Sequence, residues 1–174
     1  MPTKKPRRLI VGDIHGCADE LSELLFRFKF MPGHDILFTV GDVIGKGPKP
    51  REALELLRQF GARSVLGNHE AHCLNAAAKL SDMRKHVVIA VRTWDGKGEE
   101  MNRPDQDPPW FECVSPAKIV VFGHWALRGL VDLPKFKGLD SGCVYGRELT
   151  AWSPDDKKFH HVTARRAYAP IRVD

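Results

Sequence analysis

The N-terminal part of the chain alternates apolar runs with segments of helical periodicity. The runs 9–11, 35–40 and 64–66 predict short strands. Between them, residues 18–30 and 49–60 carry apolar side chains at three- and four-residue spacing, which predicts two amphipathic helices. Strands that alternate with helices predict a largely parallel sheet covered by helices, and therefore an α/β protein.

The second half of the chain has a different pattern. Residues 70–79 are rich in alanine and predict a third helix, and the apolar run 86–91 could form a strand. Residues 95–109 are rich in proline, glycine and charge, which predicts a long loop. After it, short strands separated by turns predict a β meander, with strands at 118–122, 136–139, 148–152 and 157–163 and a turn at 153–156.

Four of the apolar runs end in a glycine that precedes a side chain of the metal-binding type. These side chains are Asp13, with His15 two positions later, Asp42, Asn68, with His69 directly after it, and His124. In a parallel sheet the carboxyl ends of the strands meet at one edge, where ligands bind. Because carboxylate, amide and imidazole groups bind hard or borderline divalent metals, we expect these residues to form one metal site.

The residue types also suggest how two cations would be shared. Asp13, His15 and Asp42 offer two oxygens and one nitrogen to a first cation. Asp42 can also bridge to a second cation, which Asn68 and His124 would bind. Two metal ions roughly 3.5–4 Å apart can clamp a phosphoryl group and generate hydroxide between them, so no serine or cysteine nucleophile is needed.

Two further residues have expected roles in such a reaction. His69 follows the ligand Asn68 without being needed as a ligand, so it is the natural general acid for the leaving oxygen. Lys46, in the segment 45–48 (GKGP), supplies positive charge for the phosphate oxygens that do not react. A P-loop is excluded because Gly47 stands where that motif requires serine or threonine.

Each feature also has a simpler interpretation when it is taken alone. The segment 12–16 (GDIHG) could be a turn with a capping aspartate, and Asn68 could cap a helix. His124 could be a core histidine behind a buried strand. Because all of these features follow apolar runs in order, we favour the metal site. Three histidines without such a context are expected at the surface, namely His34, His160 and His161.

Length, composition and charge limit the class of protein. With 174 residues, 43% of them apolar, the chain can bury one ordinary core. We expect a basic arm at residues 1–7, one domain at 8–163 and a tail at 164–174. The net charge of +5 favours anionic partners, but no basic patch interleaved with aromatic residues indicates sequence-specific nucleic-acid binding. No apolar stretch is long enough to span a membrane.

Cysteine usage adds an expectation about the compartment. Cys17, Cys73, Cys113 and Cys143 are dispersed and include no Cys-x-x-Cys pair. Together with the absence of a secretion signal, this pattern predicts reduced thiols that pack as small hydrophobic groups in a cytoplasmic protein. The basic arm is at most a weak signal for the nucleus or for an anionic surface.

As an ordered set, the motifs resemble those of the calcineurin-like metallophosphoesterases. Within this group the chain is most similar to the ApaH-like branch of the phosphoprotein-phosphatase superfamily, the symmetrical bis(5'-nucleosyl)-tetraphosphatases. Residues 138–151 resemble the closing segment of that branch, and the resemblance covers residues 8 to about 80 and about 110 to 163. The motifs are Gly12-Asp13-x-His15-Gly16, Gly41-Asp42-Val43-x-Gly45-Lys46-Gly47-Pro48, Gly67-Asn68-His69-Glu70 and Gly123-His124-Trp125-Ala126.

The resemblance implies a four-layer α/β/β/α sandwich and a metal-dependent hydrolase of phosphoanhydride or phosphoester bonds. The first expected reaction is cleavage of diadenosine tetraphosphate to ADP by a metal-bridged hydroxide. Polyphosphate, capped RNA and phosphoproteins are alternative substrates in the wider family. The resemblance also implies two divalent ions, with Mn²⁺ as the first choice and Fe, Co or Zn as alternatives. We expect a monomer that binds a phosphorylated small molecule or nucleotide.

The chain also departs from the family pattern. Between Asn68 and His124, relatives have a longer insert with a strand that ends in His-Ala-Gly, and the histidine of that motif binds the second metal. This chain has no such motif, and Lys79-Leu80 resembles the seam of a deletion. We therefore expect an incomplete sandwich at about 79–117 and a weakened second metal site. His72 and His86 are poor substitutes for the missing ligand.

Two other positions bear on catalysis. Gly45 replaces the aspartate that orients the catalytic histidine in protein phosphatases, and Arg84 resembles a phosphate-binding arginine of the family. Two hypotheses follow. The chain is either a dinuclear-metal hydrolase or a truncated, catalytically impaired homologue that binds metal or nucleotide.

Overall fold

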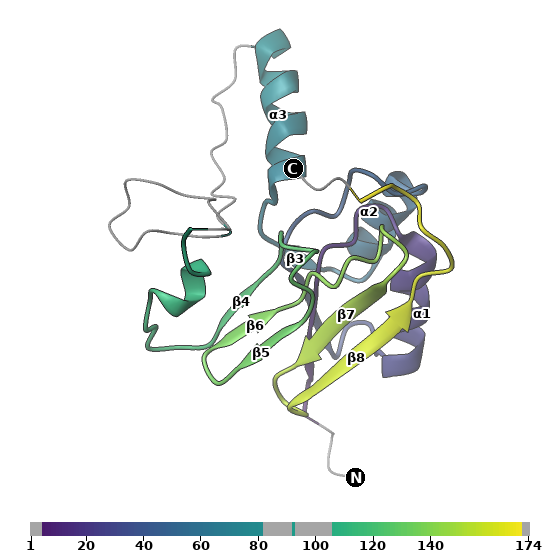
Figure 1. The fold of residues 1–174 in the computed structure, drawn as a ribbon. Helices are drawn as coiled ribbons and strands as arrows, with labels where there is room; N and C mark the ends of the chain where they lie inside the picture. The colour runs from purple at the N-terminus through teal and green to yellow at the C-terminus, as the bar shows by residue number, and fades with distance from the viewer. Residues whose placement is uncertain (1–4, 82–91, 93–105, 172–174) are drawn as a thin grey trace.

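The structure is a computed structural model that describes residues 5–81, 92 and 106–171. Its first half contains three strands and three helices in alternation, and its second half contains a 3₁₀ helix and five strands (Figure 1). The elements of the first half are β1 (Arg8–Val11), α1 (Ala18–Phe28), β2 (Ile36–Thr39), α2 (Pro50–Gln59), β3 (Arg63–Ser64) and α3 (Asn68–Ser81). Those of the second half are η1 (Trp110–Glu112), β4 (Val120–Phe122), β5 (Val131–Leu133), β6 (Phe136–Gly138), β7 (Glu148–Ser153) and β8 (Lys158–Thr163).

The larger sheet has five strands in the order β3-β2-β1-β7-β8. Strands β1, β2 and β3 are parallel, whereas β7 pairs antiparallel with both β1 and β8. The predicted parallel sheet is therefore confirmed for the first three strands, and the β7–β8 hairpin extends it with antiparallel pairs. Since β1 lies at the centre, residues that follow β1 and β2 emerge side by side at one edge.

Helices α1 and α2 form a layer against this sheet. In α1, Leu21, Leu24 and Phe28 lie three or four residues apart and are buried, so they form the stripe that faces the core. Asp19 lies in the first turn, where a negative charge suits the helix dipole, and Lys29 ends the helix in a left-handed conformation with φ 54°. Burial of each leucine contributes ~1.5–3 kcal/mol to folding.

The second sheet has three strands in the order β4-β6-β5, and η1 packs against it. The Trp110 and Phe122 rings meet edge to face with centroids 5.1 Å apart, and Phe111 and Phe136 complete an aromatic cluster. Neither η1 nor β5 was predicted from the sequence. Within the described residues, the chain thus forms a helical layer, two sheets and a short outer helix, as expected for the α/β/β/α arrangement.

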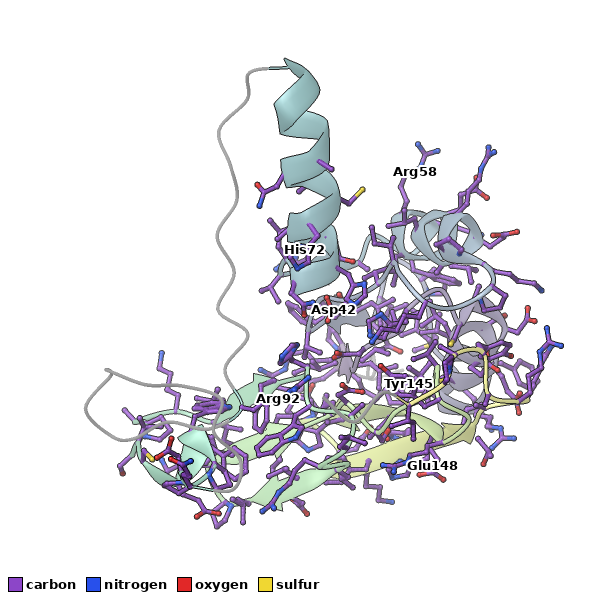
Figure 2. All side chains as sticks on the ribbon, turned by 45° about the horizontal axis from the view of Figure 1, so that its top comes forward. Asp42, Arg58, His72, Arg92, Tyr145 and Glu148 are labelled. Carbon is purple, nitrogen blue, oxygen red and sulfur yellow. The ribbon has the colours of Figure 1, made fainter. Side chains whose placement is uncertain are left out.

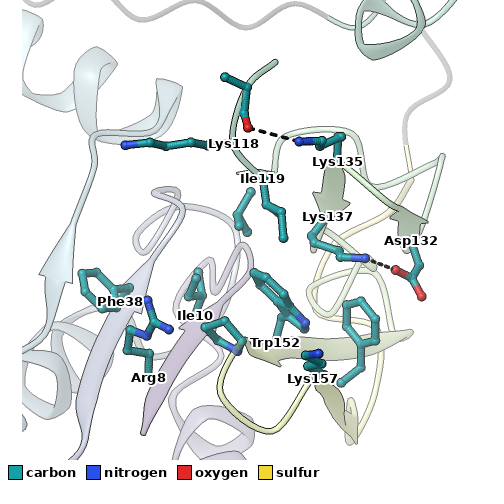
Figure 3. Close-up of a pocket in the computed structure, with 14 residues that line it drawn as sticks. Arg8, Ile10, Phe38, Lys118, Ile119, Asp132, Lys135, Lys137, Trp152 and Lys157 are labelled. Atoms are coloured by element: carbon teal, nitrogen blue, oxygen red, sulfur yellow. Dashed lines mark hydrogen bonds and ion pairs between the residues drawn. The ribbon is translucent and has the colours of Figure 1, made fainter. Parts of the chain in front are cut away.

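The faces of the two sheets leave a groove of about 820 Å³ (Figure 3). Ile10, Phe38 and Trp152 line it from the five-stranded sheet, and Ile119 and Val121 line it from the second sheet. In a complete sandwich such apolar side chains would interdigitate. The groove shows that the two sheets of this chain are incompletely packed at this place.

The predicted strand at 64–66 is wrong in its extent. Only Arg63 and Ser64 pair with β2, while Val65 and Leu66 are 63% and 42% exposed. The reason is that β3 ends the described sheet, so no neighbouring strand covers the apolar run. Helix α3 follows and projects from the body of the molecule (Figure 1).

The surface position expected for three histidines is not confirmed. His34, His160 and His161 are half-buried rather than on the surface, and the His160 ring packs edge-on against Phe28 with centroids 4.9 Å apart.

The run 86–91, His86 and Arg84 lie outside the described residues. No helix within the described ranges has the length and apolar character needed to cross a bilayer.

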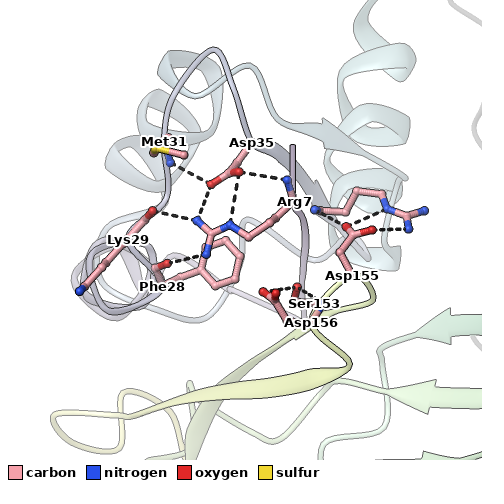
Figure 4. Close-up of polar contacts among 9 residues, drawn as sticks. Arg7, Phe28, Lys29, Met31, Asp35, Ser153, Asp155 and Asp156 are labelled. Atoms are coloured by element: carbon pink, nitrogen blue, oxygen red, sulfur yellow. Dashed lines mark hydrogen bonds and ion pairs between the residues drawn. The ribbon is translucent and has the colours of Figure 1, made fainter. Parts of the chain in front are cut away.

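Arg7, expected in the basic arm at residues 1–7, is anchored to the domain (Figure 4). Its guanidinium lies 2.7 Å from Asp35 Oδ2 and also donates to the carbonyls of Phe28 and Lys29. Burial alone would raise the pKa of Asp35, but hydrogen bonds from Arg7 and from the Met31 amide outweigh burial and lower it. The pair joins the start of β1 to the segment between α1 and β2.

Replacement of Arg7 by alanine should lower the free energy of unfolding by about 2–3 kcal/mol at neutral pH, because it leaves the buried Asp35 carboxylate without its cation. A carboxylate whose pKa is lowered by folding stabilises the folded protein at pH values above its ordinary pKa. This stabilisation is lost as the pH falls through the lowered pKa. The difference in the free energy of unfolding between wild type and Arg7→Ala should therefore become smaller as the pH falls from about 5 to about 3. Urea unfolding across this range measures it.

Arg8→Ala is the matched control, because the side chains of the Arg8–Asp155 ion pair are 52% and 31% exposed. Arg8→Ala should lower the free energy of unfolding by less than about 1 kcal/mol. Equal losses for the two variants would contradict the role given to Asp35.

Candidate metal centre

The loops that follow β1, β2 and β4 bring the predicted metal ligands to one edge of the fold. Three of the ligands, His15, Asp42 and His124, have positive φ angles of 46°, 48° and 77°. Such a conformation costs a non-glycine residue free energy and tends to occur at functional sites. The three strained residues turn their chains sharply at the strand ends and so place their side chains in one cluster.

Asp13 lies at the bottom of the cluster and is buried. Its Oδ2 accepts a 2.9 Å hydrogen bond from the His124 amide, whereas its buried Oδ1 has no partner within the described residues. Burial, followed by the nearby carboxyl groups of Asp140 and Asp42, raises the pKa of Asp13. A buried carboxylate oxygen without a donor, close to other carboxyl groups, is the arrangement that a cation would relieve.

His15, Asp42 and His69 offer ligand atoms that lie within 4.8 Å of one another. Burial, and then repulsion by His69, lowers the pKa of His15 to about 4, so its imidazole is neutral at physiological pH. His15 Nδ1 lies 3.2 Å from the Ile44 carbonyl oxygen, and a hydrogen bond there leaves Nε2 as the acceptor. The structure therefore brings His69 closer to the metal ligands than the sequence suggested.

The ligands expected for a second ion also meet. The Oδ1 atom of Asn68, the first residue of α3, lies 2.8 Å from His124 Nδ1, which follows β4. Burial, and then the positive charge of Arg92, lowers the pKa of His124 and keeps its ring neutral. Asp42 Oδ1 accepts a 2.9 Å hydrogen bond from the His69 amide, so Asp42 lies between the two groups of ligands.

Close approach of backbone makes glycine necessary at two positions. A Cβ atom on Gly123 would lie 1.8 Å from Asp13 Oδ1, and one on Gly45 would lie 2.6 Å from His69 Nδ1. Gly45 also has a φ of 132°, which side chains rarely adopt. The small residue at position 45 thus gives room to the paired rings of His15 and His69, whose centroids are 4.6 Å apart.

Glu70 holds the loops around this centre. Its carboxylate accepts hydrogen bonds from the amides of Asp42 (2.8 Å), Ile44 (3.0 Å) and Gly67 (2.9 Å). The bond to Gly67 is a helix-capping contact, because Glu70 is the third residue of α3 and reaches back to the amide that precedes the helix. The capping contact is thus made by Glu70, whereas the Asn68 side chain, which the sequence suggested as a possible cap, meets His124 instead.

The expected phosphate-binding residues lie around the mouth of the centre. Lys46 Nζ contacts the hydroxyl of Tyr145. Figure 2 shows Asp42 near the base of α3, with Arg92 and Tyr145, which also line the cavity, lower in the view. The cavity has a volume of about 140 Å³ and is lined by His15, Asp42, Lys46, Asn68, His69, Arg92, His124, Trp125, Ala126, Leu127, Asp140, Tyr145 and Ile171.

Comparison with known families agrees with this geometry. The family described as calcineurin-like phosphoesterase matches residues 6–169, which is almost the whole chain. The chain belongs to the calcineurin-like phosphoesterase family.

Two bacterial relatives and one solved structure illustrate the similarity. Symmetrical bis(5'-nucleosyl)-tetraphosphatase of Citrobacter koseri is 43% identical over 259 residues, covering 86% of this chain and 92% of the relative. The enzyme of the same name from Vibrio parahaemolyticus is 29% identical over 257 residues, covering 86% of this chain and 96% of the relative. A crystal structure described provisionally as a diadenosine tetraphosphatase is 30% identical, covers 94% of this chain and 96% of its own, and superimposes with a TM-score of 0.79.

The Vibrio alignment also bears on the predicted deletion. It extends over 257 residues, more than the 174 residues of this chain, so that relative contains residues without a counterpart here. Within the described residues, no histidine besides His15, His69 and His124 lines the cavity, and His72 is exposed on α3.

The calcineurin-like phosphoesterase family uses divalent metal ions, and the residues present fit such ions. The neutral rings of His15 and His124 and the carboxylates of Asp13 and Asp42 supply nitrogen and oxygen ligands of the expected kind. The unpartnered Asp13 Oδ1 gives the site an anionic oxygen with no other role in the described structure. The family assignment and the geometry therefore agree.

Three residues of the centre escaped the sequence analysis. Asp140 is buried beside Asp13, and burial raises its pKa to about 6. Asp140 follows β6 and Leu139, so the same signal of an apolar run followed by a ligand-type residue could have identified it. Arg92 had no such signal, because it lies outside every predicted element. Glu70 escaped because its hydrogen bonds to the Asp42 loop join segments that are distant in the sequence.

Replacement of Glu70 by glutamine should weaken metal binding about 10–100-fold, because groups that position ligands have effects of this size. Glutamine places an NH₂ group where the carboxylate accepts backbone hydrogen bonds, so at least one amide near Asp42 loses its partner. Calorimetric titration with Mn²⁺ measures the affinity. Glu52→Gln, on the exposed face of α2, changes the net charge equally and should leave the affinity unchanged. Equal affinities of the two variants would contradict the role of Glu70.

Proposed function

We propose that this chain is a metal-dependent hydrolase that cleaves diadenosine tetraphosphate symmetrically to two molecules of ADP. The observation that carries the proposal is the meeting of Asp13, His15, Asp42, Asn68 and His124 at one edge of the fold, with one buried Asp13 oxygen left unpartnered. The substrate comes from the tetraphosphatase names of its relatives. The positive charges of Lys46 and Arg92 at the cavity agree with a polyphosphate substrate.

The divalent ions, when bound, supply Lewis acidity and a water of lowered pKa. We propose Mn²⁺ as the first choice, with Fe, Co or Zn as alternatives, since the ligands are mixed nitrogen and oxygen groups. Asp13, His15 and Asp42 would hold the first ion, and Asp42, Asn68 and His124 the second. The free thiols of the described chain agree with a reducing, cytoplasmic compartment.

His69 is proposed as the general acid. Its amide donates to Asp42 Oδ1, and its ring packs against His15, so both backbone and ring are fixed beside the ligands. From this position the imidazole can donate a proton to the leaving phosphate oxygen. The grouping of His69 with His15 and Asp42 also allows it to be a metal ligand, and experiment can separate the two roles.

Lys46 and Arg92 are proposed to bind the phosphate oxygens that do not react. Both line the cavity, and the hydroxyl of Tyr145 contacts the Lys46 ammonium group. Fixed cations at these places stabilise the charge that develops on a phosphoryl group. The lining position of Arg92 supports this role, while the Arg84 suggested by the sequence lies outside the described residues and stays a prediction.

Purified protein with Mn²⁺ should convert diadenosine tetraphosphate to ADP alone, without AMP or ATP. Asp42→Asn should reduce kcat by at least about 100-fold, because it removes the proposed bridging carboxylate. Product analysis by chromatography distinguishes symmetrical from asymmetrical cleavage. A folded protein that binds Mn²⁺ but turns over neither this substrate nor an aryl phosphate would support the impaired homologue instead.

His69→Ala should reduce kcat about 10²–10⁴-fold. If His69 acts as a general acid, the loss should be larger with phenyl phosphate than with 4-nitrophenyl phosphate, because the nitrophenolate leaves without protonation. His72→Ala is the matched control, since His72 lies on the same helix but is exposed. Equal losses with both substrates, together with weaker Mn²⁺ binding, would instead make His69 a metal ligand.

A further inference from the structure

A second group of metal-binding side chains lies in the core, apart from the proposed catalytic ligands. Cys17 precedes α1, Glu20 lies in its first turn, and Cys143 follows β6. The three residues are 0%, 1% and 2% exposed, and each offers a ligand atom within 4.8 Å of the other two. We propose that these three side chains bind a zinc-type cation.

Glu20 provides the strongest argument, because packing does not account for it. Its Oε1 accepts hydrogen bonds from the Arg165 amide at 3.0 Å and from the Tyr168 hydroxyl at 2.6 Å. Its Oε2 is buried and has no partner within the described residues. Among these residues no lysine or arginine side chain forms an ion pair with Glu20. A buried carboxylate oxygen without a donor is costly, and a cation would satisfy it.

The two thiols determine which cation fits. Two sulfurs and one carboxylate oxygen suit zinc, which binds cysteine sulfur at ~2.3 Å and carboxylate oxygen at ~2.0–2.2 Å. In tetrahedral geometry the two sulfurs would be roughly 3.8 Å apart, so the thiols would have to move by no more than about an ångström from the present separation. The catalytic ligands offer only nitrogen and oxygen, so the two sites differ in their preferred metal.

The charge balance of binding is favourable for a buried site. Each thiol releases one proton when it becomes a thiolate ligand. Two protons therefore leave as one divalent cation enters, and the net charge of the core is unchanged. Because the site is closed, the cation would enter through local opening of the segments around it, and filling would be slower than at the catalytic ligands, which line an open cavity.

The site would connect three parts of the fold. Cys17 lies two residues after the ligand His15, Cys143 lies three residues after Asp140, and Glu20 already holds the C-terminal segment through Arg165 and Tyr168. A bound ion would fix the loops after β1 and β6 relative to α1. This role does not depend on the proposed hydrolysis, so its test needs no measurement of turnover.

Cobalt provides the test, because a thiolate bound to Co²⁺ gives a near-ultraviolet charge-transfer band that nitrogen and oxygen ligands do not give. Metal-free full-length protein titrated with Co²⁺ should develop this band, and Zn²⁺ should remove it by displacement. The intensity of this band should be at least about tenfold lower in Cys143→Ser and in Cys17→Ser than in the wild-type protein. Cys73→Ser, which alters an exposed cysteine on α3, should retain it.

The outcomes decide the proposal without ambiguity. No band in the wild-type protein, with Co²⁺ still bound at the catalytic centre, would overturn it. A full band in folded Cys143→Ser, or its loss in Cys73→Ser, would also overturn it. If the serine variants do not fold, Glu20→Gln and Cys143→Ala replace them, with circular dichroism to confirm the fold. Glu20→Gln should weaken Co²⁺ affinity while the band remains, because the thiolates are still present.

Discussion

The carboxylate of Glu70 is the contact on which the catalytic geometry depends. A backbone that turns sharply after a strand leaves amides that the sheet no longer pairs, and Glu70 accepts three of them, from Asp42, Ile44 and Gly67. It does so from the first turn of α3, so one side chain joins the exit of β2 to the start of that helix. The ligands Asp42 and Asn68 are thereby held in a fixed relation before any metal binds. Charged acceptors form stronger hydrogen bonds than neutral ones, which suits a position that has to resist strain.

That strain and the burial of like charges are the cost of the site. His15, Asp42 and His124 adopt left-handed backbone conformations. Burial, and then neighbouring carboxyl groups, raises the pKa of Asp13, and burial raises that of Asp140. Neither feature helps the metal-free fold, since a chain selected for stability alone would avoid both. Divalent cations would relieve the charge repulsion, while the backbone strain is the cost of aiming the side chains at one point. The folded chain is thus built for its metal-bound state, and its unpartnered Asp13 oxygen is the clearest sign of this.

The sequence predicted most of the framework because the relevant signals are local. Helical spacing in α1 and α2, apolar runs at β1 and β2, and glycine before each ligand can all be recognised within a few residues. Contacts between distant segments could not be recognised in this way. From sequence alone Arg7 falls in the basic arm, because its partner Asp35 is 28 residues away. Val65 and Leu66 looked like a buried strand because an apolar run does not reveal whether a neighbour exists to cover it. Arg92 had to be placed by the structure, since nothing around it in the sequence marks a binding residue.

The two halves of the catalytic centre rest on parts of the fold that differ in support. Asp13, His15 and Asp42 follow β1 and β2, which pair with each other in the middle of the larger sheet and are covered by α1. Asn68 and His124 begin α3 and follow β4, and each of these elements is peripheral: α3 projects from the body, and β4 has one partner strand among the described residues. Local opening is easiest where few contacts resist it. Asp13, His15 and Asp42 therefore lie on the better supported elements, whereas Asn68 and His124 depend on the Glu70 contacts and on their own 2.8 Å contact to keep their positions. Loss of these contacts would disturb the proposed second metal position more than the first.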